Sequence, residues 1–324
     1  MMDYKLLGRT GVKVSPLCFG TMSFGAEADR AEAGRMYGAC RDAGINFFDC
    51  ADIYSNGRAE EILGDLIAGE RDRVVITSKC FNALSDDVNA GGGSRRHVSL
   101  AVEASLRRLK TDRLDILFMH QFDASTPLQD TLRGLEDVVR AGKAVYLGAS
   151  NYAAWQIATG LGISGRRGWS RFDVIQPMYN LVKRQAEAEI LPLAAAEGLG
   201  VISYGPVAGG LLTGKYRWQD TTTSGRIADN KAYNARYREK WAYDTAAAFA
   251  AFATAAGHHP VSLAVAWVAA HPAVTAPIIG ARNVEQLMPS LKALDIAMTA
   301  ELRADISALS RTPPPTTDRL EEQA

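Results

Sequence analysis

The 324-residue sequence has few cysteines, no excess of either charge and no long apolar run. Its 36 basic and 36 acidic side chains balance, so the charge gives no reason to expect nucleic acid or an anionic membrane as a partner. No apolar stretch approaches the roughly 18 residues of a membrane span. The N-terminal segment MMDYKLLGRTGVKVSP carries scattered charges, unlike a secretory signal. We therefore expect a cytoplasmic protein.

The four cysteines are too few and too scattered for a disulfide framework. Cys18, Cys40, Cys50 and Cys80 show no paired C-x-x-C spacing of the kind that binds zinc, so we expect buried, reduced thiols and no metal site. A metal-dependent barrel hydrolase is a weaker alternative, because its ligands would cluster at strand ends. Of five histidines, only His120 lies at one.

What the sequence does contain is a regular alternation of short apolar runs with amphipathic stretches. In HVSLAVEASLRRLK, helical spacing puts one set of residues on a single face: Val98, Ala101, Val102, Ser105, Leu106 and Leu109. Alternating strands and helices predict parallel pairing through right-handed crossovers, and eight strands close into a barrel. The runs lie near residues 17–20, 46–49, 74–79, 114–120, 144–150, 173–177, 200–205 and 276–280. The sequence thus predicts an α/β fold, an (α/β)8 TIM barrel.

An open doubly wound sheet is the competing architecture. GLGISG at 160–165 fits a G-x-G-x-x-G fingerprint, but NYAAWQIAT before it has the pattern of a helix and not of the strand that the fingerprint requires. We interpret the match as a loop or helix end.

The two ends of the chain have their own signals. Turn residues from Gly8 to Gly11 between two short runs predict a β-hairpin before the first barrel strand. The Pro-rich, charged end at 313–324 has the composition of a flexible tail. We therefore predict a single barrel domain over 1–312.

A long segment without clear periodicity, 206–237, follows the seventh strand. Loops of that length in a compact domain are usually functional covers or disordered. We expect residues 216–237, with Tyr216, Trp218 and Tyr233, to close over a cofactor or substrate.

Polar side chains stand at the ends of three predicted strands. Asp49 ends the second, Lys79 the third and His120 the fourth, while Tyr54 lies in the loop after the second. Functional groups of α/β barrels gather where strands end and loops begin. We expect these four side chains to meet at one rim.

The four residue types suit one kind of chemistry. A lysine ending VVITSK is costly to bury unless an anion meets it, and Asp49 is placed to do so; a buried ion pair without chemistry is the alternative for these two alone. A nearby ammonium is expected to lower the pKa of Tyr54 from its ordinary value of about 10. With His120 orienting the same oxygen, the set suits carbonyl reduction, in which that oxygen is protonated as hydride reaches carbon.

The sequence resembles the aldo-keto reductase superfamily over nearly its whole length. The matching motifs, in the family's order, are GINFFDCADIYSNGRAEEILG, VVITSK, LDILFMHQFD, GKAVYLGASNY, VIQPMYN, ISYGPVAGGLLTGKY and PIIGARNVEQL. The resemblance implies an (α/β)8 barrel, an extended NADPH bound without a Rossmann domain, and a catalytic tetrad that falls on Asp49, Tyr54, Lys79 and His120. Tyr54 would be the proton donor.

The resemblance also implies which residues hold the nicotinamide end. Ser150, Asn151 and Gln176 match positions that bind the carboxamide, and each offers groups suited to an amide. Tyr204 is similar to the family's ring that stacks on the nicotinamide. The neighbouring rim would contribute Gly20, Thr21, Met22 and Asp49.

The phosphate and adenosine contacts follow in the same way. The pyrophosphate loop would comprise Gly205, Pro206, Val207, Ala208, Gly210 and Lys215, with Arg226 as a second clamp. GARNVEQL starts a helix after the eighth strand, where Gly280, Gln286 and Ser290 would line the adenosine side. Arg282 would meet the 2′-phosphate with two hydrogen bonds, which favours NADPH over NADH. Pro289 and Ser290 depart from the Glu and Asn common in the family.

The substrate follows less directly from the sequence. We expect a small-molecule carbonyl or alcohol substrate, an aldehyde or a bulky ketone rather than a highly charged sugar phosphate, in an apolar pocket. Its lining would include Met22, Phe24, Tyr54, Phe81, Phe122 and Tyr152. The same site would oxidise an alcohol in reverse. An alternative function comes from the potassium-channel β subunits, a branch that GARNVEQL resembles, whose members bind NADP(H) and act as partner proteins. A full tetrad favours turnover. The sequence leaves the oligomeric state open.

Overall fold

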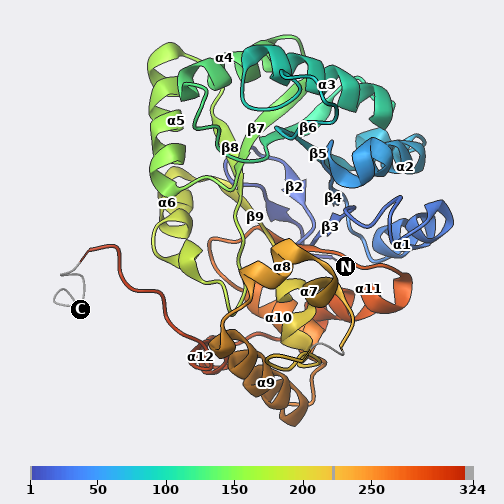
Figure 1. Cartoon of the computed structure of the whole chain (residues 1–324), viewed down its shortest axis with the longest axis vertical. Helices are drawn as coiled ribbons and strands as arrows, with labels where there is room; N and C mark the ends of the chain where they lie inside the picture. Colours follow the sequence, from blue (N-terminus) through green and yellow to red (C-terminus); the bar gives the residue numbers. More distant parts are fainter. Residues whose placement is uncertain (1, 221–222, 318–324) are drawn as a thin grey trace.

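The computed structural model describes residues 2–220 and 223–317 and consists of one closed parallel barrel with helices around it (Figure 1). Within these residues, eight strands form the barrel in the order β10, β3, β4, β5, β6, β7, β8, β9, and two more form an antiparallel hairpin. The barrel strands are β3 (Cys18–Gly20), β4 (Phe47–Asp49), β5 (Val75–Cys80), β6 (Leu114–Met119), β7 (Ala144–Ser150), β8 (Phe172–Gln176), β9 (Gly200–Tyr204) and β10 (Ala276–Ile279). The predicted (α/β)8 barrel is confirmed.

Each of the eight predicted runs forms a barrel strand, with no end shifted by more than one residue. His120 falls just after β6, yet its amide donates to the Cys80 carbonyl at 3.0 Å and so extends the β5–β6 ladder by one bond. Strand pairing aligns Gly20 with Asp49, Asp49 with Thr77, and Lys79 with Phe118. The polar ends of β4, β5 and β6 therefore meet at one rim.

The predicted N-terminal hairpin is present as β1 (Lys5–Leu6) and β2 (Lys13–Val14). Gly8, at φ +54°, lies so close to the start of β9 that a Cβ there would stand 2.4 Å from the Gly200 nitrogen. On the other side, the Tyr146 hydroxyl donates to the Thr10 carbonyl at 3.1 Å. The hairpin therefore closes the end of the barrel where the strands begin, opposite the rim that carries the polar groups.

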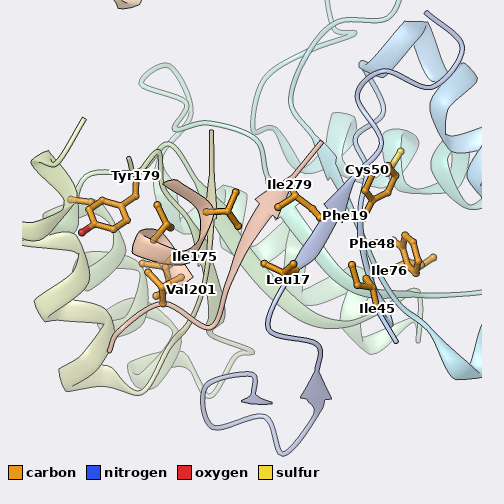
Figure 2. Packing of buried hydrophobic residues seen from close by; sticks show 14 of the residues in the cluster. Leu17, Phe19, Ile45, Phe48, Cys50, Ile76, Ile175, Tyr179, Val201 and Ile279 are labelled. Carbon is orange, nitrogen blue, oxygen red and sulfur yellow. The ribbon is translucent and has the colours of Figure 1, made fainter. Parts of the chain in front are cut away.

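Side-chain alternation divides the core into two layers. Phe47 of β4 packs inside the barrel with Phe118, Val174 and Ile202, beside Leu7 from the hairpin segment. The adjacent residues on the same strands point outward under the helices, and Figure 2 shows Leu17, Phe19, Phe48, Ile76, Ile175 and Val201 in this outer layer. Strands buried on both faces are expected to be continuously apolar, which is the pattern that made the runs recognisable.

The helices cover the outside of the barrel (Figure 1). They are α1 (Arg30–Asp42), α2 (Arg58–Ile67), α3 (Arg95–Leu109), α4 (Leu128–Arg140), α5 (Ala154–Arg167), α6 (Ile190–Glu197), α7 (Arg226–Asp229), α8 (Lys231–Arg236), α9 (Lys240–Ala255), α10 (Pro260–Ala269), α11 (Val284–Leu291) and α12 (Ala300–Ala308). Short 3₁₀ segments are η1 (Tyr54–Gly57), η2 (Arg71–Arg73), η3 (Gln185–Glu187), η4 (Ala208–Thr213) and η5 (Lys292–Asp295). The predicted face of α3 is buried at all six positions. GLGISG lies inside α5, so it is no dinucleotide fingerprint.

The segment after β9 is more regular than the sequence indicated. Residues 206–237 include η4, α7 and α8, where an irregular loop was predicted. Helices of four to six residues are too short to show an apolar period, and α8 begins because the Asn230 side chain accepts from the amides of Ala232 and Tyr233. Residues 221–222 of this segment lie outside the described residues.

Three further sequence expectations concern the cysteines, membrane-spanning segments and the C-terminal tail. The four cysteines are free and buried. Along the described chain, no helix is both long enough and apolar enough to cross a bilayer. The proposed tail begins at 313, and its residues 318–324 lie outside the described part; before them, the Thr316 hydroxyl donates to the Ala188 carbonyl at 3.1 Å.

Candidate active site

The four polar residues from neighbouring strand ends form one cluster: Asp49, Tyr54, Lys79 and His120. Lys79 is fully buried, and its Nζ donates to Asp49 Oδ2 at 2.6 Å, to the Cys50 carbonyl at 2.7 Å and to the Tyr54 hydroxyl at 3.3 Å. An ammonium has three N–H donors, so each finds a partner. Burial alone would lower the pKa of Lys79, but Asp49 and Tyr54 outweigh it and raise that pKa above its ordinary value. Lys79 is therefore a fixed positive charge.

Asp49 is held by more than the lysine. Its second oxygen, Oδ1, accepts from Thr77 Oγ1 at 2.7 Å and from Gln176 Nε2 at 2.8 Å. A buried carboxylate is tolerated when its lone pairs are satisfied in this way. The orientation of the ion pair is therefore fixed by both neighbouring and distant strands.

The Tyr54 ring is placed by a strained turn. Ser55 and Asn56, just after it, have φ of +49° and +54°, which non-glycine residues seldom adopt. The Ser55 hydroxyl donates to the Phe24 carbonyl at 2.7 Å and stabilises the turn. Gly57, at φ +89°, has no room for a side chain, because a Cβ would lie 2.7 Å from Arg108 Cδ. This compact turn holds the Tyr54 hydroxyl next to Lys79.

The acidity of Tyr54 differs from the sequence expectation. Burial of the phenol outweighs the Lys79 charge and raises the pKa of Tyr54 to about 12, so the predicted lowering below 10 is wrong for this arrangement. The sequence indicated the charge next to the phenol but not how strongly the surrounding protein desolvates it, although the ring is only partly buried. At neutral pH, Tyr54 carries its proton.

His120 faces Tyr54 edge-on, with ring centroids 6.1 Å apart and planes at 79°. Burial, together with Lys79, lowers the pKa of His120 to about 3, so the imidazole is neutral. Its Nδ1 lies 3.2 Å from the Asn82 side-chain nitrogen. When Asn82 donates this bond, the imidazole proton is on Nε2, which makes His120 a neutral hydrogen-bond donor.

A long cavity of about 1020 Å³ runs from this cluster along the rim to the start of α11. Its lining includes most of the residues predicted to bind the cofactor: Gly20, Met22, Asp49, Ser150, Asn151, Gln176, Tyr204, Gly205, Pro206, Val207, Gly210, Lys215, Arg226, Gly280, Arg282, Gln286 and Ser290. Thr21 and Ala208 do not line it. Both are fully buried, and the Thr21 hydroxyl turns back to donate to the Asp49 carbonyl at 3.0 Å.

The end of the cavity near the cluster is bordered by a linked set of polar groups. The Tyr204 hydroxyl donates to Asn151 Oδ1 at 2.7 Å. The Asn151 amide nitrogen in turn donates to the His120 carbonyl at 2.9 Å and to Ser150 Oγ at 3.1 Å. Strands β6, β7 and β9 are thus tied together at the rim, beside the Tyr54 hydroxyl.

Comparison with known proteins adds an independent finding. The profile described as the aldo/keto reductase family matches residues 16–311. The chain belongs to the aldo/keto reductase family. It is accordingly an oxidoreductase enzyme, and the family supports carbonyl reduction as its general activity.

Individual relatives cover nearly the whole of this aldo/keto reductase. An uncharacterized oxidoreductase, YrpG, of Bacillus subtilis is 38% identical over 93% of this chain and 94% of its own length. A probable voltage-gated potassium channel subunit beta of Oryza sativa subsp. japonica is 37% identical over 98% and 99%. A versiconal hemiacetal acetate reductase of Aspergillus parasiticus is 32% identical over 93% and 94%.

The predicted substrate pocket of this aldo/keto reductase is confirmed at two positions, wrong at Phe24 and Tyr152, and untested at Phe81 and Phe122. Of the six residues, only Met22 and Tyr54 line the cavity. Phe24 and Tyr152 are buried in the core, and Phe81 and Phe122 pack against it. Aromatic residues near strand ends are also ordinary packing material, and one sequence does not separate the two uses.

Two charged residues escaped sequence reasoning, one in the cavity and one beside the arginines that line it. Arg236 of α8 lines the cavity, and its guanidinium lies 4.8 Å from the Tyr233 ring centroid; no acidic group of the described residues pairs with it within 4.0 Å. Glu27 lies between two predicted phosphate ligands, 3.5 Å from Arg226 and 3.8 Å from Arg282. Neither residue stands at a strand end, so no pattern marked them.

Proposed function

We propose that this protein reduces an aldehyde or ketone to an alcohol with NADPH, with Tyr54 as the proton donor. The observation that supports this most is the position of Tyr54. The residue lines the cavity, its phenol carries its proton at neutral pH, and its hydroxyl lies 3.3 Å from the buried Lys79 ammonium. The same site runs alcohol oxidation in reverse.

The cluster supplies the proton and polarises the carbonyl. When bound, NADPH would provide the hydride. The Nε2–H of His120 donates a hydrogen bond to the carbonyl oxygen and fixes its position beside the Tyr54 hydroxyl. Tyr54 gives its proton to that oxygen, which becomes a far stronger base than a phenolate as the alkoxide forms. Lys79 stabilises the phenolate left behind, and Asp49 keeps Lys79 in place.

The cavity suits an extended dinucleotide. Its volume is at the upper end of the roughly 300–1,000 Å³ usual for ligand sites, and four cations line it: Lys215, Arg226, Arg236 and Arg282. Gly210, at φ +93°, also lines it and leaves the backbone open to close approach.

The proposed cofactor contacts are divided along the cavity. Ser150, Asn151 and Gln176 would hold the carboxamide, and Tyr204 would stack on the nicotinamide ring. The segment 205–215 with Arg226 would hold the pyrophosphate, and Arg282 the 2′-phosphate. Glu27 already satisfies both arginines partly, so their phosphate contacts must compete with that carboxylate.

A second candidate function is a cofactor-binding partner protein. The similarity to the rice relative, a probable voltage-gated potassium channel subunit beta, favours it. One kinetic experiment separates the two functions, because a reductase consumes NADPH over many turnovers while a binding module does not.

The decisive test is steady-state loss of NADPH absorbance with a panel of neutral aldehydes and ketones, run beside Tyr54→Phe. We expect sustained turnover, and we expect the variant to keep NADPH binding while losing most of the reduction, because only the phenolic proton is removed. Cofactor binding measured by fluorescence titration is the control. Retained turnover in Tyr54→Phe would remove Tyr54 from the mechanism, and tight binding without turnover would favour the partner protein.

A further inference from the structure

A second carboxyl group is buried just behind the cluster. Asp52, two residues before Tyr54, is fully buried, and neither of its carboxylate oxygens has a hydrogen-bond partner among the described residues. The adjacent Ile53 amide favours the charged form of Asp52, but its geometry falls short of a hydrogen bond. No step of the proposed reaction uses this group.

The charges around Asp52 do not compensate it. Glu60 of α2 is also fully buried and is already occupied, since it accepts from Ser78 Oγ at 2.5 Å and from Arg108 Nε at 2.7 Å. Its negative charge opposes ionisation of Asp52, while Arg108 of α3 and Lys79 of β5 favour it. The nearby thiols of Cys50 and Cys80 are neutral, because burial, the largest influence on them, raises their pKa values. Two buried carboxylates with one local arginine are more stable with one proton retained.

The backbone couples Asp52 directly to the lysine. The Asp52 amide donates to the Lys79 carbonyl at 3.2 Å, and the Lys79 ammonium donates to the carbonyl of Cys50, two residues earlier, at 2.7 Å. The segment 50–54 is therefore bonded both to the backbone carbonyl of Lys79 and to its side-chain ammonium. A new charge on Asp52 would act on the ammonium and on the turn that carries Tyr54.

We propose that Asp52 is a positioning residue that must be protonated for efficient carbonyl reduction, because its uncharged carboxyl group leaves Lys79 committed to Asp49 and Tyr54. The inference rests on the proposed function. The negative charge of ionised Asp52 would partly cancel the stabilisation that the Lys79 ammonium gives to the Tyr54 phenolate. It would also favour a shift of the turn that carries Tyr54. Both effects would make Tyr54 a weaker proton donor.

The other members of the cluster do not titrate in the ordinary range. The pKa of Tyr54 is raised to about 12 and that of His120 is lowered to about 3, while the pKa of Lys79 is raised. Burial and Glu60 raise the pKa of Asp52 to about 7. A change of rate near neutral pH that Asp52→Asn removes would therefore point to Asp52.

The test is kcat for reduction of a neutral aldehyde at saturating NADPH, from pH 5.5 to 9. Saturation removes the effect of the cofactor's own phosphate titration on binding. We expect kcat of the unaltered protein to fall as pH rises through about 7, by on the order of three- to tenfold for one nearby buried charge at an effective dielectric of about 20. Asp52→Asn should keep the low-pH rate throughout, because the amide is neutral and of the same size. Asp86→Asn, on the exposed loop after β5, is the matched control and should keep the fall.

Stability gives a readout that does not need turnover. A carboxyl group whose pKa is raised in the folded state binds more protons there, so its contribution favours folding at low pH and is lost as pH rises from about 4 through about 7. The melting temperature of Asp52→Asn relative to the unaltered protein should therefore increase between pH 5 and pH 8. If this difference in melting temperature increases but the protein turns over no carbonyl compound, only the proposed function would be overturned. The role of Asp52 would be overturned if the difference in melting temperature between the two proteins did not change with pH. It would also be overturned if kcat of Asp52→Asn still fell as pH rises through about 7.

Discussion

The buried ion pair permits a sharp test of what Lys79 contributes to the fold. In Lys79→Met, the chain keeps an apolar side chain of similar length but loses all three donors to Asp49, the Cys50 carbonyl and Tyr54. Asp49 retains only the bonds from Thr77 and Gln176. Removing one partner of a buried pair typically costs about 3–5 kcal/mol, and we expect a loss of unfolding free energy in this range.

The double variant separates the lost charge from the lost packing. Asp49→Asn combined with Lys79→Met removes the uncompensated carboxylate, and neutral replacements of buried pairs are often nearly as stable as the pair. We expect the double variant to recover at least roughly 2 kcal/mol of the loss. The measurement is the urea midpoint of unfolding, followed by circular dichroism.

The pH dependence of the same variants checks the cause. Without Lys79, the buried Asp49 carboxylate has no counter-charge, so its charged form is costly in the folded state. We therefore expect Lys79→Met to be more stable at low pH, where carboxyl groups are protonated, than at high pH. Its deficit relative to the double variant should be larger at pH 8 than at pH 5. A deficit that is equal at both pH values, or a double variant no more stable than the single, would refute the reasoning.

Two further predictions concern the cofactor and the barrel floor. Arg282→Ala should weaken NADPH binding by roughly 1–3 kcal/mol, the usual value of charged hydrogen bonds, and NADH binding much less, in fluorescence titrations of both cofactors; equal losses would reject contact with the 2′-phosphate. Gly8→Ala should lower the unfolding free energy by roughly 1–3 kcal/mol through overpacking, because the new Cβ would stand 2.4 Å from the Gly200 nitrogen. Gly11→Ala is the matched control in thermal melts, since Gly11 also has positive φ but no atom within 4 Å of its Cβ position.

Sequence patterns predicted the barrel well because its strands are buried on both faces. Runs such as ILFM at 116–119 are apolar throughout, and each barrel run was followed by a segment with helical period, so type and order were recoverable. Strand ends were equally informative, since parallel pairing places the ends of adjacent strands at one rim. Asp49, Lys79 and His120 were found by this rule, and the family resemblance added the cofactor positions.

Features that depend on three-dimensional environment were not recoverable. The pKa of Tyr54 depends on how far burial outweighs one nearby charge, and no local pattern reports burial of a loop residue. Arg236 enters the cavity from a six-residue helix, and Glu27 reaches Arg226 and Arg282 from a turn. The positions of both depend on packing across the rim. For the same reason, Phe24 and Tyr152 turned inward although their sequence positions equally suited a pocket wall.

The bond between Gln176 and Asp49 shows how closely the site depends on barrel closure. In the strand order of the barrel, β8 lies four positions from β4, so this 2.8 Å hydrogen bond reaches between opposite walls. The bonded residues are 127 positions apart in the chain. The carboxylate that fixes Lys79, and through it the Tyr54 hydroxyl, is therefore itself fixed by a strand that no local segment can supply. Because the barrel must close before this bond can form, the geometry for proton donation belongs to the complete fold, and a partly opened barrel would leave a buried charge pair without its support.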